Sequence, residues 1–172
     1  MAVIPTIETE RLILSGPTST DFPDIAAMWA DPIVVRHIGG VPFSAEDAWA
    51  RLLKYAGHWE LMGFGTWIAR ERSGRFVGEV GLFDLHRAIE PAIVLPEAGW
   101  VLASDAHGKG YATEAMQRVL AWGEQQLGAR TFSAIIDDDN TASLRVASKC
   151  GFREHARTTY KDTPVIMLRR AV

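Results

Sequence analysis

The sequence has little cysteine: Cys150 is the only one in 172 residues, so no internal disulfide can form. We therefore expect a reducing, cytoplasmic setting. No apolar run approaches the about 20 residues that a membrane span needs, and the first residues lack the basic and apolar regions of a signal peptide. The net charge of −3 argues against binding to nucleic acid or to a membrane surface.

Metal-ligand spacing is absent as well. The five histidines are scattered, and neither an HxxxH nor a CxxC motif occurs, so we predict no metal site. The chain has no internal repeat, no low-complexity segment and no linker-like stretch. Its composition, 48% hydrophobic and 23% charged, is that of an ordinary globular protein. We therefore predict a single domain over residues 1–172.

Hydrophobic periodicity predicts a mixed α/β (α+β) fold with one central sheet flanked by helices. Apolar residues at helical spacing mark the segments 19–31, 43–62, 110–129 and 140–152. Strand patterns mark 11–17, 65–71, 75–85, 97–103, 130–137 and two final strands within 158–171. The tight turn "RSGR" should make 65–71 and 75–85 an antiparallel hairpin. The strand–helix–strand piece from Glu97 to Asp137 should be a right-handed parallel crossover.

Two of these helices have a predicted apolar face. The helix 43–62 begins with Ser44 and Asp47, which are spaced as in a capping box. Its apolar residues are Trp49, Leu52, Leu53, Ala56 and Trp59. The face of helix 110–129 that we expect to be apolar consists of Ala112, Ala115, Met116, Val119, Leu120, Gly123 and Leu127.

A glycine-rich stretch, "DAHGKGYATEA", joins the strand 97–103 to this long helix. It does not match a P-loop, because its glycines are wrongly spaced and no Ser or Thr follows Lys109 at the required place. A dinucleotide fingerprint would need Gly or Ala where Thr113 stands. Two interpretations stay open. The bare amides of the helix N-terminus could bind a phosphate or pyrophosphate, with Lys109 adding charge, or the glycines could only form a tight turn.

With its surroundings, the stretch resembles the GNAT superfamily of acyl-CoA N-acetyltransferases. The pyrophosphate loop of that family has the pattern Gln/Arg-x-x-Gly-x-Gly/Ala, and residues 107–112 match it except for His107 at the first position. The later Asn-x-x-Ser helix that ends in Lys-x-Gly-Phe is matched by Asn140, Ser143, Lys149, Gly151 and Phe152. "ETERLIL" near the N-terminus and "EAGW" from Glu97 to Trp100 are similar to the RimJ/RimL-like branch of ribosomal-protein alanine N-acetyltransferases.

The resemblance implies acetyl-CoA as donor and a primary amine, either a protein N-terminus or a small amine, as acceptor. It also implies the residues that bind coenzyme A. Those at the pyrophosphate are His107, Gly108, Lys109, Gly110, Tyr111, Ala112 and Thr113. Backbone groups of Trp100, Val101 and Leu102 should lie beside the pantetheine and the thioester, where an amide can stabilise an oxyanion. Homodimers are common in the family, so a homodimer is a further expectation.

For the proton that the amine must lose, Glu97 is the first candidate base and Glu79 the second. Relatives often have a tyrosine acid seven positions after the Asn, where this chain has Ala147. Ser143 is expected to orient the sulfur of coenzyme A, and Asn140 to bind pantetheine or to cap its helix.

Two alternatives to the enzyme remain open. One is an acyl-CoA-binding sensor that has lost catalysis, which Ala147 and His107 motivate, and the other is a dinucleotide oxidoreductase. Residues 31–65 should shape the acceptor pocket, together with one or two of Trp29, Trp49 and Trp59. The charges of this region are mixed and name no acceptor: Asp31, Arg36, Glu46, Asp47, Arg51 and Glu60.

Overall fold

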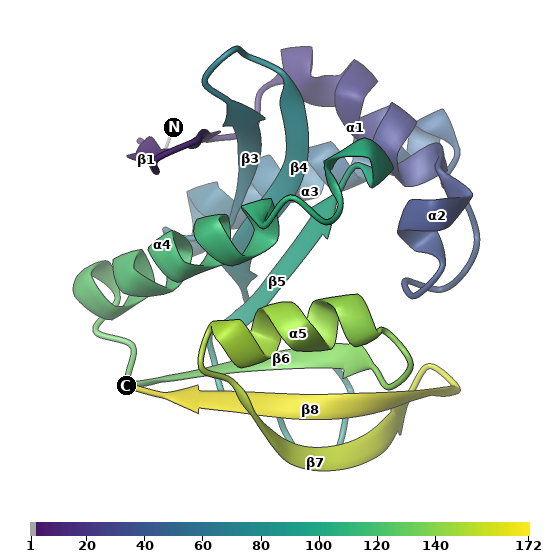
Figure 1. Cartoon of the computed structure of the whole chain (residues 1–172), viewed down its shortest axis with the longest axis vertical. Helices are drawn as coiled ribbons and strands as arrows, with labels where there is room; N and C mark the ends of the chain where they lie inside the picture. The colour runs from purple at the N-terminus through teal and green to yellow at the C-terminus, as the bar shows by residue number, and fades with distance from the viewer. Residues whose placement is uncertain (1–2) are drawn as a thin grey trace.

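The computed structural model describes residues 3–172, which form an eight-stranded sheet with helices on both faces (Figure 1). The order of the strands across the sheet is β1-β2-β3-β4-β5-β6-β8-β7. The strands are β1 (Ile7–Glu8), β2 (Leu12–Ser15), β3 (Thr66–Glu71), β4 (Phe76–Phe83), β5 (Glu97–Leu102), β6 (Thr131–Asp137), β7 (Arg153–Tyr160) and β8 (Thr163–Ala171). The predicted mixed, mostly antiparallel sheet is confirmed.

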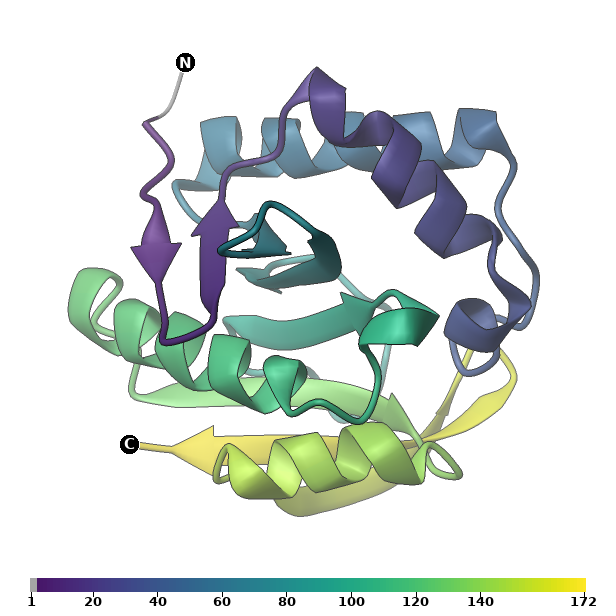
Figure 2. The same cartoon turned by 45° about the horizontal axis from the view of Figure 1, so that its top comes forward.

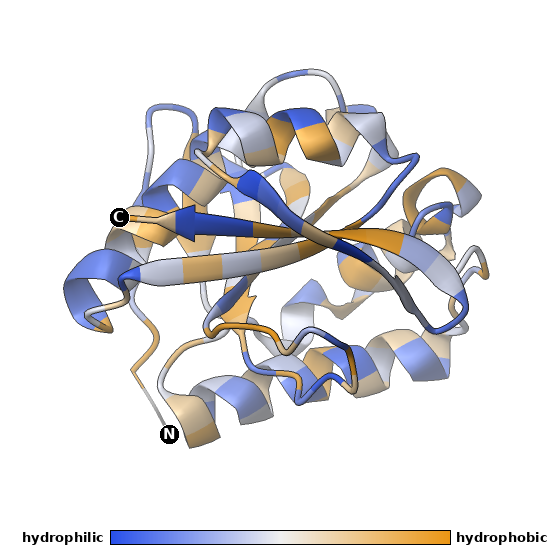
Figure 3. Cartoon of the chain, turned by 90° about the horizontal axis from the view of Figure 1, so that it is seen from below, coloured by the Kyte–Doolittle hydropathy of each residue, from blue (hydrophilic) through white to orange (hydrophobic). Residues whose placement is uncertain are grey.

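The helices divide between the two faces of the sheet (Figure 2). They are α1 (Phe22–Ala30), α2 (Pro32–Val35), α3 (Ala45–Met62), α4 (Tyr111–Gln126) and α5 (Thr141–Lys149), with short 3₁₀ turns at Ser19–Asp21 and Ser104–Ala106. The buried side of α4 packs with β4 and β6 into the main core, whereas α1, α2 and much of α3 form a second cluster around Trp29 and Ile68. In Figure 3 the visible helices carry both hydrophilic and hydrophobic residues, as helices that cover a sheet do.

The sheet is parted near its middle. The strands β5 and β6 are parallel, as predicted, but they are paired only at Glu97 and Ser133. Beyond this point the two strands diverge toward their carboxyl ends (Figure 1). On its other edge β5 is fully paired with β4, from Glu97 opposite Phe83 to Leu102 opposite Gly78. One edge of β5 is therefore left open along most of its length.

Two short elements were missed by the sequence patterns. The two-residue strand β1 pairs with β2 through a turn in which Thr9 N–H donates to the carbonyl of Leu12. The four-residue helix α2 is capped by Asp31, whose carboxylate accepts the N–H of Ile33. Neither element is long enough to show a period of 2 or of 3.6 residues, so neither could be found by periodicity.

The predicted face of α3 is partly wrong. The helix has the predicted capping box of Ser44 and Asp47 and ends at Gly63 in a left-handed conformation. Its buried residues, however, are Ala48, Leu52, Tyr55 and Trp59. Trp49 and Leu53 are 39% and 54% exposed, and Ala56 is exposed. The prediction left out Tyr55, which is buried and whose hydroxyl donates to Glu79.

The predicted face of α4 is confirmed at five positions, which are Ala115, Met116, Val119, Leu120 and Gly123. Leu127 lies just beyond the last helical residue and is 37% exposed, so its placement on this face was wrong. Across residues 3–172, helices with both the length and the apolar character needed to span a membrane are not found.

Candidate active site

The N-terminus of α4 offers a row of unpaired amides beside the open edge of β5. Gly108 and Gly110 have positive φ angles of 75° and 82°, which favour glycine over residues with a Cβ. No side chain caps the helix, and the N–H groups from Gly108 to Thr113 donate no hydrogen bond within residues 3–172. Such amides, together with the helix dipole, are suited to an anion such as a phosphate.

The loop is fixed by contacts from distant parts of the chain. Arg11 donates to the carbonyl of Lys109 at 2.8 Å and forms a 2.6 Å ion pair with Glu114 in the first turn of α4. The hydroxyl of Tyr111 donates to Glu71 at 2.9 Å. These bonds hold the loop and the first turn of α4 in place. Their amides therefore do not have to be ordered when an anion binds.

The open edge of β5 presents the backbone groups of alternate residues. Ala103 N–H donates to Val77, so in the antiparallel ladder Val101 should bond with β4, while Trp100 and Leu102 point their N–H and C=O groups toward the gap. The ring of His107 turns back to the Leu102 carbonyl, with Nε2 at 2.9 Å. Of the three residues predicted to face pantetheine, Trp100 and Leu102 therefore have their backbone groups on the open edge of β5. The backbone groups of Val101 face β4, and Val101 lines the pocket described next.

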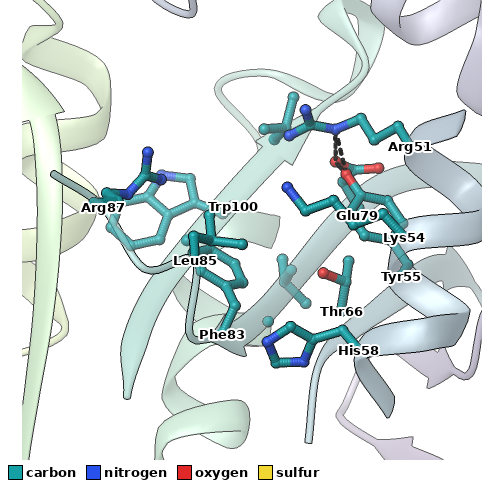
Figure 4. Close-up of a pocket in the computed structure, with 14 residues that line it drawn as sticks. Arg51, Lys54, Tyr55, His58, Thr66, Glu79, Phe83, Leu85, Arg87 and Trp100 are labelled. Atoms are coloured by element: carbon teal, nitrogen blue, oxygen red, sulfur yellow. Dashed lines mark hydrogen bonds and ion pairs between the residues drawn. The ribbon is translucent and has the colours of Figure 1, made fainter. Parts of the chain in front are cut away.

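A pocket opens between α3 and the strands β4 and β5 (Figure 4). The residues that line it are Arg51, Lys54, Tyr55, His58, Thr66, Glu79, Val80, Gly81, Phe83, Leu85, Arg87, Gly99, Trp100 and Val101. A second, more open hollow shares Arg51 and Lys54 with it and is also lined by Val41, Pro42, Phe43, Asp47 and Ala50. The pocket is thus lined by Gly99, Trp100 and Val101, which belong to the stretch of β5 whose open edge faces the gap.

Glu79 is the carboxylate that lines this pocket. It is 3% exposed and lies opposite Val101 in the β4–β5 ladder. Its Oε1 accepts the hydroxyl of Tyr55 and lies 3.5 Å from Nε of Arg51. Burial raises the pKa of Glu79, and the nearby Arg51 charge offsets only part of that effect. Such a group, poised to take a proton, is common at functional sites.

The second oxygen of Glu79 has no hydrogen bond. Its Oε2 and the Nε1 of Trp29 are buried without a hydrogen bond of good geometry within residues 3–172, although Trp29 is close enough to lower the pKa of Glu79. A buried carboxylate oxygen without a partner is costly. A carboxyl with such an oxygen holds a proton more readily than an exposed one, in line with the raised pKa of Glu79.

Glu97, the first candidate base, is bound to Arg87. Three hydrogen bonds of 2.8–3.0 Å join Nε and a terminal nitrogen of Arg87 to both carboxylate oxygens. Glu97 is 3% exposed and is not among the residues that line the pocket. Its strand position is as predicted, at the start of β5, but its carboxylate serves an ion pair. No sequence pattern pointed to Arg87, which lies in an irregular segment.

The helix α5 is built as the sequence predicts. The side chain of Asn140 caps it by accepting the N–H of Ser143 at 3.1 Å. Ser143 is half-buried, and its hydroxyl makes no hydrogen bond within the described residues. Ala147 is fully buried in the main core, so the position of the missing tyrosine is filled by packing. Cys150 is also buried, and burial raises the pKa of its thiol to about 11; a nucleophilic role is thereby disfavoured.

The three tryptophans predicted for the acceptor pocket are not among the residues that line this pocket, although Trp29 lies against Arg51. Trp29 and Trp59 are buried, and Trp49 packs edge-on against Phe22. The tryptophan that lines the pocket is Trp100. His58 also lines it, but Asp84 N–H donates to Nε2 and Nδ1 lies 2.6 Å from the carbonyl of Phe64. Both ring nitrogens are thus engaged, and His58 fixes the loop after β4 rather than moving protons.

A histidine and two aspartates meet across the open side of the gap. Nδ1 of His37, just after α2, lies 2.8 Å from Asp139 and 3.7 Å from Asp137, at the end of β6. Within the part of the chain that the structure describes, this is the group of side chains whose ligand atoms are close enough to hold a metal ion. Since exposed acidic groups often cluster without a metal, we interpret it as an ion-pair contact between the two sides of the gap.

The family model described as "Acetyltransferase (GNAT) domain" matches residues 11–153, and the chain belongs to this family. Among its relatives, the uncharacterized N-acetyltransferase YnaD of Bacillus subtilis (strain 168) is 37% identical over 147 residues, which are 86% of this chain and 82% of YnaD.

Solved structures agree with the fold. An acetyltransferase from Agrobacterium tumefaciens (strain C58) superposes with a TM-score of 0.85 at 26% identity, covering 99% of this chain and 96% of that one. At 15% and 17% identity the similarity concerns the fold alone. These structures are the ribosomal L7/L12 acetyltransferase RimL with coenzyme A, at a TM-score of 0.80, and spermidine N-acetyltransferase of Vibrio cholerae with CoA and spermine, at 0.73. One acts on a protein and the other on a small amine, so the family does not define the acceptor.

Proposed function

We propose that this protein transfers the acetyl group of acetyl-CoA to a primary amine by direct attack of the amine on the thioester. The observation that carries the proposal is the continuity of three features: unpaired amides at α4, an open edge of β5 and the pocket of Glu79. The amides suit a pyrophosphate, the edge suits the amides of a pantetheine arm, and the pocket suits an amine. Trp100 lies on the open edge of β5 and also lines the pocket. The donor and the acceptor would therefore meet at Trp100.

When bound, acetyl-CoA supplies an activated acyl group that needs no further activation by the protein. The amides from Gly108 to Thr113 would bind the pyrophosphate, with Lys109 adding positive charge. The backbone N–H of Trp100 or Leu102 would donate to the acyl oxygen and stabilise the negative charge that develops on it. Ser143, whose hydroxyl has no other partner, would orient the sulfur.

The proton of the amine goes to Glu79 in this proposal. An ammonium ion is not a nucleophile, so the amine must be deprotonated before or during attack. Glu79 lines the pocket and has a raised pKa, whereas both oxygens of Glu97 are occupied by Arg87. Since Ala147 leaves no tyrosine acid at that position, the thiolate would leave without a proton from this helix.

The test compares two identical substitutions at the two ends of α4. Gly108 and Gly128 both have positive φ angles, 75° and 63°, and a Cβ at either would meet no atom within 4 Å. Gly108→Glu places a carboxylate among the amides at the N-terminus and should abolish binding of CoA, measured by calorimetry. Gly128→Glu carries the same backbone strain at the other end and should bind CoA as the parent protein does.

Turnover is followed as release of thiol from acetyl-CoA over a panel of primary amines. Undiminished binding of CoA to Gly108→Glu would place the donor elsewhere. Binding of CoA without turnover of any amine in a broad panel would favour the alternative function, an acyl-CoA-binding sensor.

A further inference from the structure

The acceptor pocket contains more positive than negative charge. Arg51, Lys54 and Arg87 line it, and Glu79 is the one carboxylate among its lining residues. Glu97 lies behind Arg87 and is bound to it through both oxygens, so this pair is already neutral. The pocket is thus left with Arg51 and Lys54 against a single buried carboxyl, whose charged form burial disfavours.

Arg51 is held in place by its contacts, and some of its hydrogen-bond donors remain available. Its guanidinium lies 3.7 Å from the ring centre of Trp29, and its Nε donates to the hydroxyl of Tyr55. Its two terminal nitrogens make no hydrogen bond within residues 3–172. Because the stacking on Trp29 orders the side chain, these donors are already oriented for a partner.

Lys54 is a cation without an anionic partner. It makes no hydrogen bond or ion pair within the described residues, and its side chain points into the pocket (Figure 4). Partial burial, together with the positive charges of Arg51, Arg87 and Lys161, lowers the pKa of Lys54, and the negative charge of Glu97 offsets only part of this effect. An ammonium group held close to like charges costs free energy unless an anion joins it.

Lys54 and Arg51 also form the boundary between the pocket and the second hollow, since both residues line both spaces. The acidic side chain of that hollow, Asp47, already accepts hydrogen bonds from the hydroxyl and the N–H of Ser44. An anion bound at this boundary would therefore lie a short way from Glu79. The rest of its molecule could extend into the hollow.

We infer that the acceptor is an amine that carries a carboxylate near its reacting nitrogen, and that Lys54 and Arg51 bind this carboxylate. The inference rests on the proposed acetyl transfer. The amine would face the carboxyl of Glu79, which lines the pocket, while the carboxylate completes the charge balance of the pocket. A polyamine would instead bring a second cation next to Lys54. The carboxylate could be that of a free amino acid or that of an acidic side chain at a peptide N-terminus.

The experiment uses matched acceptors with the full-length protein. In the first series, several amino acids are compared with their α-carboxamides. In the second series, peptides that begin with Glu are compared with peptides that begin with Gln, and these peptides all have amidated C-termini. Spermidine is the cationic acceptor. We expect kcat/KM to be at least about tenfold higher with the carboxylate in one of the two series, the effect of a charge-assisted hydrogen bond. The series in which the preference appears identifies the source of the carboxylate. The amine of a carboxamide is less basic than that of the acid, so amine reactivity alone would give the opposite order.

The variant Lys54→Met removes the charge at an exposed position. It should raise KM for carboxylate-bearing amines by about ten- to a hundredfold, leave kcat nearly unchanged and leave the carboxamides unaffected. The variant Lys54→Glu should lose the carboxylate preference and improve spermidine. Arg118→Met, at an exposed position of α4, makes the same change in net charge and should match the parent protein.

Two results would overturn the inference while acetyl transfer stands: equal or better turnover of carboxamides or spermidine, or an equal effect of Lys54→Met on both classes. If no amine is turned over, the proposed function fails instead. Calorimetry in the presence of CoA then decides the inference. Binding of a carboxylate-bearing amine that Lys54→Met weakens supports it, and the absence of such binding refutes it.

Discussion

Glu79 shows how one buried group can be kept reactive. Placing a carboxylate out of water costs several kcal/mol, and the hydroxyl of Tyr55 and the charge of Arg51 return only part of this. Burial also raises the pKa of Tyr55 well above its usual value, so Tyr55 stays a hydrogen-bond donor. The balance leaves the carboxyl more basic than that of an exposed glutamate, in a side chain that lines the pocket.

Substitution of this residue should separate activity from stability. In Glu79→Gln we expect kcat to fall by about 10²–10⁴, the usual contribution of a positioned base. In the parent protein kcat/KM should fall as the pH drops through the raised pKa of Glu79, because the protonated form cannot accept a proton. The variant should lack this acidic limb. The measurement is the pH profile of acetyl transfer with a fixed amine.

The same variant should be more stable than the parent at neutral pH. The folded-state pKa of Glu79 is raised, so between the unfolded and folded pKa values the folded state binds the extra proton. Stability of the parent therefore decreases as the pH rises through this interval and is lowest above the folded-state value. Glutamine does not ionise and avoids this loss, which denaturant unfolding at pH 5 and pH 7 would measure.

Glu97→Gln is the comparison for both measurements. It leaves Arg87 without its anion, and breaking a buried ion pair in this way costs about 3–5 kcal/mol, so the variant should be less stable. Its residual activity should keep the acidic limb of the pH profile. If Glu97→Gln loses that limb and Glu79→Gln keeps it, the base is Glu97.

At the scale of elements, α3 places four pocket residues at once. Arg51, Lys54, Tyr55 and His58 follow one another at spacings of three, one and three residues. Such spacing puts them along one side of a helix. The helix is capped by Ser44, whose hydroxyl accepts the N–H of Asp47, while the carboxylate of Asp47 accepts the N–H and hydroxyl of Ser44.

Removing this cap tests how firmly the pocket is held. Ser44→Ala should destabilise the protein by about 1 kcal/mol at neutral pH. The hydrogen bonds from Ser44 lower the pKa of Asp47, so they stabilise the fold above the usual aspartate pKa and lose this effect as the pH falls through the lowered value. The difference between parent and variant should therefore shrink in acid, as followed by thermal unfolding. Ser148→Ala, at an exposed position of α5, is the control and should be near neutral.

The long elements could be predicted from the sequence, and the charges of the pocket could not. Periodicity identified α3 and α4, because each helix buries one face, and the strands β3–β6 were found from apolar, strand-forming residues between turns, although β3 and β4 are buried on both faces. The motif at Gly108 and Gly110 indicated a turn that leaves the amides at the start of α4 unpaired, because backbone conformation is encoded locally. The choice of Glu79 over Glu97 depends on Arg87, which lies ten residues before Glu97 in an irregular segment. The excess of positive charge in the pocket likewise arises only when α3, this segment and β4 are brought together by the fold.

At the scale of the whole molecule, the parted pair of β5 and β6 makes the sheet incomplete in its middle. Binding of CoA at this gap should raise the stability of the folded state by mass action, by about 2.7 kcal/mol at a ligand concentration of 100 times Kd. The effect should be local as well as global, since the ligand would cover the amides of alternate residues along one edge.

Hydrogen exchange tests this arrangement residue by residue. With CoA, we expect slower exchange at the amides of Trp100 and Leu102, which face the gap, and little change at Val101, whose amide already faces β4. Gly108→Glu should show no such pattern at the same CoA concentration. Protection of Val101 together with its neighbours to the same degree would mean that CoA only tightens the whole fold.

The open edges of β5 and β6 have a consequence for how the protein behaves in concentrated solution. A strand edge with unpaired N–H and C=O groups is a template on which another chain can add a strand. Here that template lies inside the sheet, between β5 and β6, with the His37 contact to Asp139 across its open side. Access for a foreign strand is thereby restricted, and a bound pantetheine arm would occupy the same hydrogen-bonding groups. Bound CoA would thus also reduce self-association, and the protein without CoA would be the form most prone to aggregate.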